Sequence, residues 1–559
     1  MPDSPNRNAI AGRSAFLAVM KEEGVRRMFG NPGTTELPIM HALTAQSEIS
    51  YVLGLQESVV IAMADGFARA SGELVACNVH VAPGLGNAMG TLYTANVSGT
   101  PMIVTAGQQE QGHGLTEPLL YAPLVPIAQP VVKWAVEVSR IEDLPRIMRR
   151  AAKVAKTAPT GPVFISLPGD ILNAEAAIDL GDTTFVDTAV TPTAEAVEAL
   201  ARRILAAKSP AILAGSEIYS YDAWDEAVQL AETLGAPVWQ QSVQTGAHFP
   251  SEHAAYMGAL NRNQAQVREA LTPHDLLICL GAEVLTMSVY SPVDPLPPDT
   301  KLVQIGLRDW EMGKNWPAEI ALRADLKQTL RALVPALKKL GGQKLADAAA
   351  AALKTLEARN WSAQRAKKAQ AAAALATKSP LDPEWLMMRL SDSLPDDAVV
   401  VDEGLTTAFS LLSFYRYRDR HSYFGNVTGG IGWGIAAAVG VQLALPERKV
   451  VAVIGDGSAM YSIQALWSAA HYKAPVVFLI ANNGGYRIIK QRLKSFHGNE
   501  NFIGMDFQDP PIDMGALAQS MGVPATRVAT AAEFDAALAH AMRKTDGPCV
   551  IEAMVDRTV

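Results

Sequence analysis

Asp456 and Asn483 are the two residues whose types and positions most directly predict chemistry. Each follows a short apolar run typical of a strand buried on both faces, over residues 449–454 and 476–480. The segment between the runs, 458–472, predicts a helix that ends before a proline. Because the strands of a parallel βαβ unit end at one edge of the sheet, the two side chains should lie side by side, where open α/β sheets bind ligands.

These oxygen donors would suit a magnesium ion. Asp456 offers a carboxylate oxygen and Asn483 an amide oxygen, and the backbone carbonyl of Gly485 can complete three protein ligands. Mg²⁺ prefers oxygen ligands and keeps its remaining positions for water and phosphate. We therefore expect a magnesium site at this edge of the sheet.

The residues beside Asp456 would admit a phosphate group next to that ion. Gly455 and Gly457 let the backbone approach a diphosphate closely, and Ser458 can cap the helix that follows. The first amide groups of that helix would then point at the anion. The spacing thus predicts a combined site for a metal ion and a diphosphate.

Three polar side chains, Thr34, Glu57 and His80, stand at the ends of apolar strand-like runs in the first third of the chain. Polar groups at the carboxyl ends of strands are typical of an active site on a doubly wound sheet. Each side chain also has a structural alternative. Thr34 or Thr35 could cap a helix, Glu57 could stabilise a helix N-terminus, and His80 could be a structural histidine.

Composition limits the class of protein. The chain has 559 residues, enough for about three domains, and its 49% hydrophobic and 19% charged residues fit a soluble globular enzyme. The net charge of −8 argues against nucleic acid as the main partner. Cys77, Cys279 and Cys549 lack metal-type spacing, which predicts buried free thiols and a reducing cytoplasm.

Two segments could be mistaken for targeting or membrane signals. The first 24 residues contain no apolar core or cleavage site of a signal peptide, so we expect none. Residues 429–446 form an uncharged stretch of 18 residues, a length at the lower limit for a membrane span. The stretch includes five glycines and lies within an α/β pattern. We expect a buried helix beneath a cofactor there and no membrane-spanning segment.

Alternating strand and helix patterns predict an α/β fold with three doubly wound parallel-sheet domains. We expect an N-terminal domain over residues 1–185, a middle domain over 186–340 and a C-terminal domain over 379–559. The alanine-rich segment 341–378 predicts a helical linker on the surface. The middle domain shows no comparable polar cluster, so it is either structural or nucleotide-binding, and whether it holds FAD, ADP or nothing stays open.

The sequence GDG, followed after 24 residues by NN, is similar to the cofactor signature of the thiamine diphosphate enzymes. Several segments resemble the benzoylformate decarboxylase branch of that family over nearly the whole chain: NPGTTELP, LQESVVIAMADGFARASG, HVAPGLGNAMG, VTAGQQ and GDGSAMYSIQALWSAA. The resemblance implies pyrimidine-binding, middle and diphosphate-binding domains, in that order, with thiamine diphosphate and Mg²⁺ as cofactors. It also implies a homotetramer built from dimers, with active sites between chains.

The implied reaction is the non-oxidative decarboxylation of an aromatic or branched 2-oxo acid to an aldehyde, with possible carboligation. In it Glu57 bonds to N1′ of the cofactor pyrimidine, His80 acts as acid or base, and the Thr34 hydroxyl binds the substrate carboxylate. Gly429 would present its carbonyl to the 4′-amino group, and Ile431 would be the apolar wedge that bends the cofactor. The metal ligands would be Asp456, Asn483 and Gly485, and the cofactor contacts would also include Gly455, Gly457, Ser458 and Tyr486.

Two departures from the family pattern leave the reaction open. Residues 281–288, where a second catalytic histidine is expected, contain none, and Ser288 is the nearest equivalent. Arg487, Lys490 and Arg492 replace apolar residues, and they either lie in solvent or contact a carboxylate, a phosphate or a coenzyme A thioester. The alternative is therefore a carboligase or lyase similar to acetolactate synthase or 2-hydroxyacyl-CoA lyase. A third possibility is a cofactor-binding protein without turnover.

Overall fold

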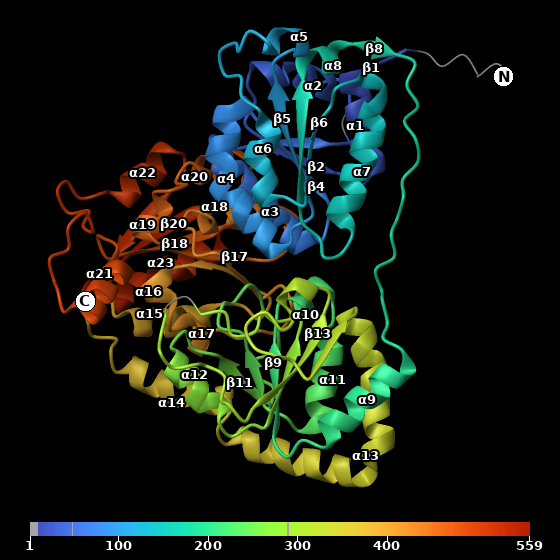
Figure 1. Cartoon of the computed structure of the whole chain (residues 1–559). Helices are drawn as coiled ribbons and strands as arrows, with labels where there is room; N and C mark the ends of the chain where they lie inside the picture. The colour runs from blue at the N-terminus through green and yellow to red at the C-terminus, as the bar shows by residue number, and fades with distance from the viewer. Residues whose placement is uncertain (1–8, 47, 288–289) are drawn as a thin grey trace.

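The computed structural model describes residues 9–46, 48–287 and 290–559, and it contains three six-stranded parallel sheets (Figure 1). The N-terminal sheet has the strand order β3-β2-β4-β5-β7-β6. Its strands are β2 (Arg27–Gly30), β3 (Ser50–Leu53), β4 (Val75–Val79), β5 (Met102–Gln108), β6 (Trp134–Glu137) and β7 (Pro162–Pro168). Its main helices are α1 (Gly12–Glu22), α2 (Leu37–Leu43), α3 (Glu57–Ser71), α4 (Val81–Ser98), α6 (Leu124–Ala128) and α7 (Leu144–Lys156).

The middle sheet has the order β11-β10-β9-β12-β13-β14, which is that of dinucleotide-binding folds. Its strands are β9 (Pro210–Ala214), β10 (Val238–Gln240), β11 (Tyr256–Ala259), β12 (Leu276–Leu280), β13 (Lys301–Gly306) and β14 (Ile320–Arg323). The flanking helices are α9 (Ala194–Leu205), α10 (Glu217–Ser220), α11 (Trp224–Leu234), α12 (Gln264–Leu271) and α13 (Leu326–Glu357).

The C-terminal sheet has the order β16-β15-β17-β18-β20-β19. Its strands are β15 (Val399–Glu403), β16 (Tyr423–Gly425), β17 (Val450–Gly455), β18 (Val477–Asn482), β19 (Ala525–Val528) and β20 (Cys549–Met554). Its helices are α15 (Pro383–Ser393), α16 (Leu405–Ala408), α17 (Leu411–Phe414), α18 (Gly434–Ala444), α19 (Asp456–Ala459), α20 (Ala465–His471), α21 (Arg487–His497), α22 (Met514–Ser520) and α23 (Ala531–Arg543). Three doubly wound sheets confirm the predicted fold class.

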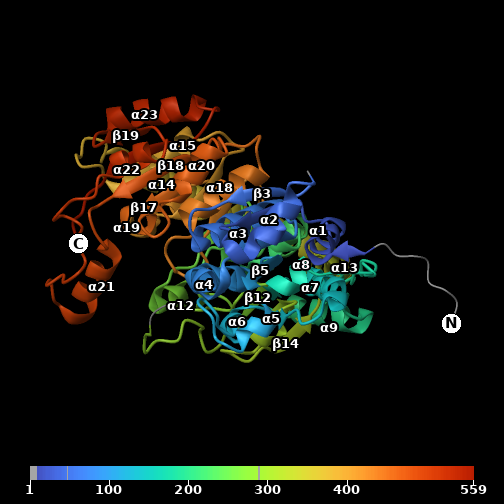
Figure 2. The same ribbon diagram turned by 90° about the horizontal axis from the view of Figure 1, so that it is seen from above.

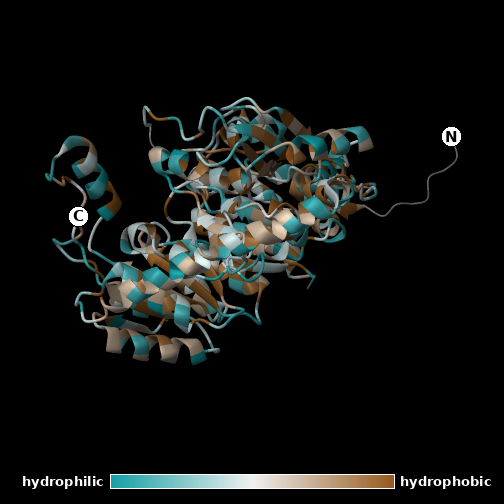
Figure 3. Ribbon diagram, turned by 90° about the horizontal axis from the view of Figure 1, so that it is seen from below, coloured by the Kyte–Doolittle hydropathy of each residue, from teal (hydrophilic) through white to brown (hydrophobic). Residues whose placement is uncertain are grey.

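The three sheet units are arranged with the N-terminal one stacked on the middle one and the C-terminal one beside both (Figures 1 and 2). Figure 3 shows hydrophobic residues mainly inside and hydrophilic residues on outward helix faces. Helices α3 and α18 pack against each other through small residues, and this contact connects the N-terminal and C-terminal units. A Cβ atom on Gly66 would lie 2.2 Å from the carbonyl oxygen of Ala437, and one on Gly440 would lie 1.9 Å from that of Met63. Only glycine permits this close approach of the two helices.

The charge-free stretch over residues 429–446 contains α18, a buried helix of 11 residues, as expected. Its preceding residue Trp433 donates from Nε1 to Asp65 Oδ2 at 2.6 Å, so the segment is tied to α3. Nowhere in the described ranges is a helix long and apolar enough to cross a membrane. The three cysteines are free and buried, which confirms that prediction.

The expected helix over residues 458–472 is wrong in its first half. The structure has a short α19 capped by Gly455 and a separate α20, and Ser458 lies inside α19 and does not cap it. The break follows from contact with a neighbouring loop. Ser462 donates from its hydroxyl to the carbonyl of Gly432 at 2.6 Å, and a Cβ on Gly432 would lie 2.5 Å from the Cβ of Tyr461.

The predicted linker is two helices. Helix α13 starts within the middle domain and bends at Gly342, whose φ is +57°. Before the bend it packs on the middle sheet, and after it most side chains are exposed. The second helix, α14 (Trp361–Ala373), is anchored, because Trp361 is buried and donates from Nε1 to the carbonyl of Leu412 at 2.9 Å. The residue boundaries of the domains and of the linker stay predictions.

Candidate active site

Glu57 begins α3 and is almost fully buried, with 7% of its surface exposed. The preceding Gln56 side chain caps the helix by accepting from the amides of Ser58 and Val59 at 2.7 and 3.2 Å. Gln56, and not Glu57, therefore caps the helix. The Oε2 of Glu57 accepts from Asn87 Nδ2 of α4 at 3.0 Å, and within the described residues Oε1 accepts no hydrogen bond. One carboxylate oxygen is thus available for a ligand.

His80 immediately precedes α4, and the structure pairs it with a residue that sequence reasoning missed, Glu36. The Glu36 carboxylate is fully buried, and its Oε2 lies 2.8 Å from His80 Nδ1. The same carboxylate accepts from the amide of Gly33 at 2.9 Å and from that of Gly107 at 2.8 Å. An ionised carboxylate can only accept, so Nδ1 carries the proton and Nε2 is left able to accept one. Glu36 follows the strand end within NPGTTELP, a position that could have signalled its role.

Thr34 and Thr35 behave differently. Thr35 donates from its hydroxyl to Glu36 Oε1 at 2.7 Å and lies 3.2 Å from His80 Nδ1. Thr34 is exposed, and no side-chain hydrogen bond caps the short helix that it begins, so the capping alternative is wrong. Since β2, β3 and β4 are neighbours in the sheet, the ends that carry Thr34, Glu57 and His80 share one edge, as predicted.

Replacing Glu36 by Gln is expected to lower kcat by about tenfold to 10³-fold, because an amide no longer fixes the His80 tautomer. Glu36 is a positioning residue, so the pH profile of kcat/KM should shift together with the rate. Glu110→Gln, an exposed change in the same domain, is the matched control. An unchanged pH profile in Glu36→Gln would contradict this role.

Asp456 follows β17 and lies beside the loop that follows β18, because these two strands are paired in parallel. Its Oδ2 accepts from the amides of Gly484 and Gly485 at 2.7 and 3.2 Å. Burial raises the pKa of Asp456 to about 6, and the backbone amides oppose that shift only in part. A cation would offset the cost of this buried charge. Asp456 and Asn483 line a cavity of about 130 Å³, which confirms their predicted proximity.

The residues around Asp456 fit a metal ion and a diphosphate. The Gly485 carbonyl accepts from the amide of Arg487 at 3.0 Å and keeps a second lone pair for an ion. The Ser458 hydroxyl is buried without a hydrogen-bond partner among the described residues, as expected of a group that hydrogen-bonds to a bound ligand. The Tyr486 ring packs directly against Gly457, since a Cβ on Gly457 would lie 2.7 Å from that ring. No group of three His, Cys, Asp or Glu side chains that could hold a metal occurs in the described ranges, and the predicted site uses only one such residue.

The adjacent Asn482 and Asn483 have different surroundings. Asn482 is buried, donates to Glu552 Oε1 at 2.7 Å and accepts from the amide of Gly484 at 3.0 Å. Asn483 is half-buried and makes no such bonds within the described residues. Position 483 is therefore the one that can offer its oxygen to a metal.

We expect Asn483→Ala to weaken Mg²⁺ binding by about tenfold or more with little change in thermal stability. Asn482→Ala is the matched comparison. It should lower the free energy of unfolding by about 1–3 kcal/mol, because it leaves the buried Oε1 of Glu552 without its donor. Magnesium titration and thermal denaturation of both variants test the contrast, and identical behaviour would refute it.

Gly429 and Ile431 belong to a loop held by Glu403. Gly429 is exposed, has φ of +74° and donates from its amide to Asn426 Oδ1 at 3.1 Å, and Ile431 is half-buried. The buried Glu403 carboxylate accepts from the amides of Gly432 and Gly434 at 2.5 and 2.6 Å. Burial raises the pKa of Glu403 to about 7. The loop thus has a defined shape, with Gly429 at the rim of a larger cavity.

The basic side chains after Tyr486 differ in whether they have a polar partner. Arg487 donates from Nε to the carbonyl of Thr558 at 2.9 Å. Lys490 forms an ion pair with Asp506 and lies 5.4 Å from the centre of the Phe502 ring. Arg492 makes no hydrogen bond or ion pair within the described residues and lines the larger cavity. Only Arg492 is therefore available to a ligand.

The middle domain contains a buried carboxylate that the sequence did not reveal, that of Glu217. Glu217 lies between the ends of β9 and β12, where the strand order reverses, and is buried. Its carboxylate accepts from the amide of Leu307 at 2.9 and 3.0 Å, and a Cβ on Gly281 would lie 2.2 Å from the Glu217 Cβ. The position that binds a phosphate in a dinucleotide-binding fold is thus filled by a side chain. The residue named in place of the missing histidine, Ser288, lies outside the described residues.

Glu217 predicts a pH dependence of stability. Burial raises its pKa from 4.5 to about 7. Between these values the unfolded chain releases a proton that the folded chain keeps, so the free energy of unfolding falls as pH rises, by up to about 3 kcal/mol. Urea unfolding at pH 4.5 and 7 should show a smaller fall in Glu217→Gln than in wild type or in the exposed control Glu269→Gln. An equal fall in all three proteins would contradict the prediction.

The functional residues form two groups within one chain. Thr34, Glu57 and His80 lie on the N-terminal sheet, and Gly429, Asp456 and their neighbours lie on the C-terminal sheet. Among the described residues, no hydrogen bond or ion pair joins the two groups directly. One of the contacts that link the two domains near these groups is between the hydroxyls of Thr94 on α4 and Thr428, which are 2.9 Å apart. The predicted site residues thus lie on two different domains of the chain.

Comparison with known proteins assigns the domains that carry these two groups to one family. The family models for the N-terminal TPP binding domain, the central domain and the C-terminal TPP binding domain of thiamine pyrophosphate enzymes match residues 10–118, 197–333 and 404–553. The chain belongs to the thiamine pyrophosphate enzyme family. Thiamine pyrophosphate, which is thiamine diphosphate, is accordingly its cofactor.

Relatives place the chain among the decarboxylases and carboligases of this family. It is 34% identical to benzoylformate decarboxylase of Pseudomonas aeruginosa over 96% of this chain and 98% of the relative. It is 25% identical to the acetolactate synthase large subunit of Haemophilus influenzae over 98% of this chain and 95% of the relative. The structure resembles 4-hydroxybenzoylformate decarboxylase of Rhodococcus jostii RHA1 with a TM-score of 0.88 and 32% identity, over 98% of this chain and 100% of that one. The chain is therefore a thiamine-diphosphate-dependent enzyme.

Proposed function

We propose that this protein decarboxylates an aromatic or branched 2-oxo acid to an aldehyde, with thiamine diphosphate and Mg²⁺ as cofactors. The observation that carries the proposal is the His80–Glu36 pair, with its 2.8 Å contact, at the strand ends beside Thr34. Release of an aldehyde requires a proton at the former carbonyl carbon. A histidine held in one tautomer by a buried carboxylate can supply and recover such a proton.

We assign the remaining roles to residues that the structure leaves open to a ligand. When bound, thiamine diphosphate supplies the nucleophile and the electron sink. Asp456, Asn483 and the Gly485 carbonyl would hold Mg²⁺, and Glu57 would bond to the pyrimidine ring through its unpartnered oxygen. The family resemblance implies the other contacts: the Gly429 carbonyl at the 4′-amino group, Ile431 as the apolar wedge, and Gly455, Gly457, Ser458 and Tyr486 around the diphosphate.

We also propose that the active site lies between two chains of a homotetramer, in the cytoplasm. The separation of the two groups of site residues within one chain supports this arrangement, as do the exposed Leu115 and Leu119, whose surfaces are 92% and 85% accessible. Mixing two inactive variants, Glu57→Gln and Asp456→Asn, after partial denaturation and reassembly should restore about one quarter of wild-type activity, because mixed dimers then contain one intact site. No recovery in demonstrably mixed oligomers would refute the shared site.

Carboligation or lyase activity is the second candidate, favoured by the acetolactate synthase relative and by the absence of histidine from residues 281–288. Product analysis distinguishes the two. The purified enzyme with thiamine diphosphate and Mg²⁺ is given a panel of 2-oxo acids with and without an acceptor aldehyde. Free aldehyde from an acid alone supports the decarboxylase. Turnover only with an acceptor would assign the enzyme to the carboligases.

A further inference from the structure

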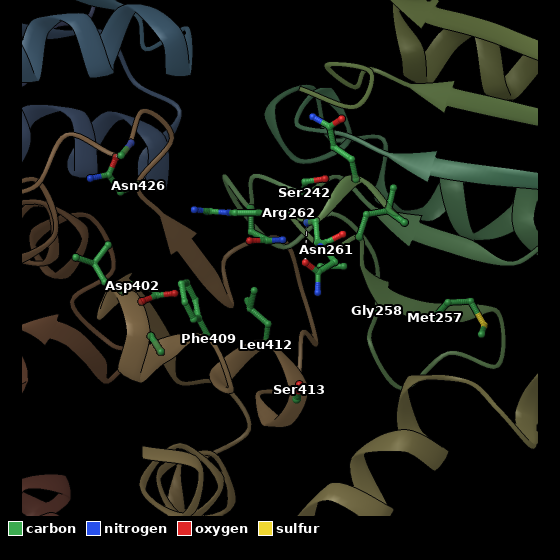
Figure 4. Close-up of a pocket in the computed structure, with 18 of the residues that line it drawn as sticks. Ser242, Met257, Gly258, Asn261, Arg262, Asp402, Phe409, Leu412, Ser413 and Asn426 are labelled. Carbon is green, nitrogen blue, oxygen red and sulfur yellow. Dashed lines mark hydrogen bonds between the residues drawn. The ribbon is translucent and has the colours of Figure 1, made fainter. Parts of the chain in front are cut away.

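A cavity of about 850 Å³ lies between the middle and C-terminal domains (Figure 4). Its volume is in the range of small-molecule binding sites. Its apolar walls include Trp361, Phe409 and Phe496, of which Phe409 and Phe496 are more than half exposed. Gly429 also lines it, so the cavity is continuous with the loop that we assign to the cofactor.

Two arginines line this cavity, one from the middle domain and one from the C-terminal domain. Arg262 follows β11, and Figure 4 shows its guanidinium pointing away from the middle domain, toward the side where Asp402, Phe409 and Asn426 lie. Arg492 lies on α21, with Ser495 and Phe496 on the same helix face.

Neither arginine is held in place by a polar contact with the described part of the chain. Helix α21 has no buried residue, and Figures 2 and 3 show it projecting from the body of the protein. Within the described residues neither guanidinium makes a hydrogen bond or an ion pair. Each therefore keeps its donors for a ligand.

The carboxylates that line the cavity form no ion pair with these arginines within the described residues. Burial raises the pKa of the Asp402 carboxyl, and Arg262 is near enough to oppose that larger effect in part. Asp402 accepts from the amide of Gly404 at 2.9 Å and from the hydroxyl of Tyr423 at 2.7 Å. Glu403 binds the amides of Gly432 and Gly434. A third arginine of the lining, Arg365, is already paired with Asp392. The free positive charge of the cavity is thus that of Arg262 and Arg492, together with Lys368, which donates to the Ser413 hydroxyl at 2.8 Å.

We propose that the cavity binds the far end of a substrate that carries a second carboxylate, and that Arg262 and Arg492 recognise this group. The inference rests on the proposed decarboxylation, in which the reacting carboxylate lies at the cofactor end beside Thr34 and His80. A planar guanidinium binds a carboxylate through paired hydrogen bonds. Aromatic walls with an arginine from each domain suit an aromatic 2-oxo acid with a carboxylate on its ring.

The test compares benzoylformate with 4-carboxybenzoylformate. Wild type should show the higher kcat/KM for the carboxylated acid. Arg262→Gln and Arg492→Gln should each lower that value by about tenfold while leaving benzoylformate nearly unaffected, since one charge-assisted contact is lost. Lys494→Gln is the matched control on α21, because Lys494 pairs with Glu500 at 2.8 Å and does not line the cavity. Equal preference for both acids in wild type and variants would overturn the inference.

Calorimetric binding of terephthalate against benzoate to the holoenzyme separates this inference from the proposed reaction. Tighter binding of terephthalate, lost in Arg262→Gln and Arg492→Gln but kept in Lys494→Gln, supports the carboxylate site even if neither oxo acid is turned over. Decarboxylation of benzoylformate without preference for terephthalate would overturn the inference alone. Tight binding of coenzyme A with no preference for terephthalate would also overturn it and assign the arginines to phosphate.

Discussion

Glu57→Gln is expected to lower kcat by about 10³-fold while the protein still folds and binds thiamine diphosphate. The amide can still accept from Asn87, which lies 3.0 Å from Oε2 in wild type, so α3 and α4 should keep their packing. It cannot act as an acid or base toward a pyrimidine nitrogen, and a group in that role contributes about 10²–10⁴ to the rate. Steady-state decarboxylation, with cofactor binding measured by calorimetry, tests both parts.

The control for this prediction is Glu73→Gln, an exposed change just beyond the end of α3. It should match wild type in rate, cofactor affinity and thermal stability. Near-wild-type turnover in Glu57→Gln would refute the assigned role. Loss of folding in Glu57→Gln would instead assign the carboxylate a structural role.

Asp456→Asn is expected to weaken binding of Mg²⁺ and thiamine diphosphate by about 100-fold or more, because it removes the one carboxylate of the predicted metal site. In the cofactor-free protein the change should be neutral or stabilising near pH 8. Burial raises the pKa of Asp456 from 3.8 to about 6, so the free energy of unfolding falls as pH rises between these values, and at pH 8 the full cost of the buried charge is present. An asparagine carries no such cost.

Two measurements at pH 8 check the Asp456 prediction. Calorimetry gives cofactor affinity with and without Mg²⁺, and thermal unfolding of the cofactor-free protein gives stability. Asp546→Asn, with 81% of its side chain exposed in the same domain, is the control and should change neither. Retained cofactor affinity in Asp456→Asn would contradict the metal site. Strong destabilisation without cofactor would show that the carboxylate mainly holds the Gly484–Gly485 turn.

The fold class and half of the site could be predicted from the sequence because both are local patterns. Apolar runs separated by helices predicted three parallel sheets, and the predicted runs 449–454 and 476–480 correspond to β17 and β18. Since residues in parallel strands of one βαβ unit end at the same edge, spacing alone predicted that Asp456 and Asn483 meet. Burial on both faces produces such patterns, and burial is readable in residue types.

Other features depend on which distant segments touch, and only the tertiary structure decided them. The Glu36–His80 pair joins residues 44 positions apart that follow the neighbouring strands β2 and β4. The break between α19 and α20 depends on a bond from Ser462 to a loop 30 residues away. Spacing does not encode such contacts, because hydrogen-bond partners are chosen by distance in space.

The basic residues after Tyr486 show the same limit most clearly. By sequence, Arg487, Lys490 and Arg492 are three similar charges on one helix. In the structure Arg487 donates to the carbonyl of Thr558 and Lys490 forms an ion pair with Asp506. Arg492 lines the cavity and has no such partner among the described residues. Residue type determined what each side chain could bind. The packing of segments far apart in the chain decided which of them is still free to bind it.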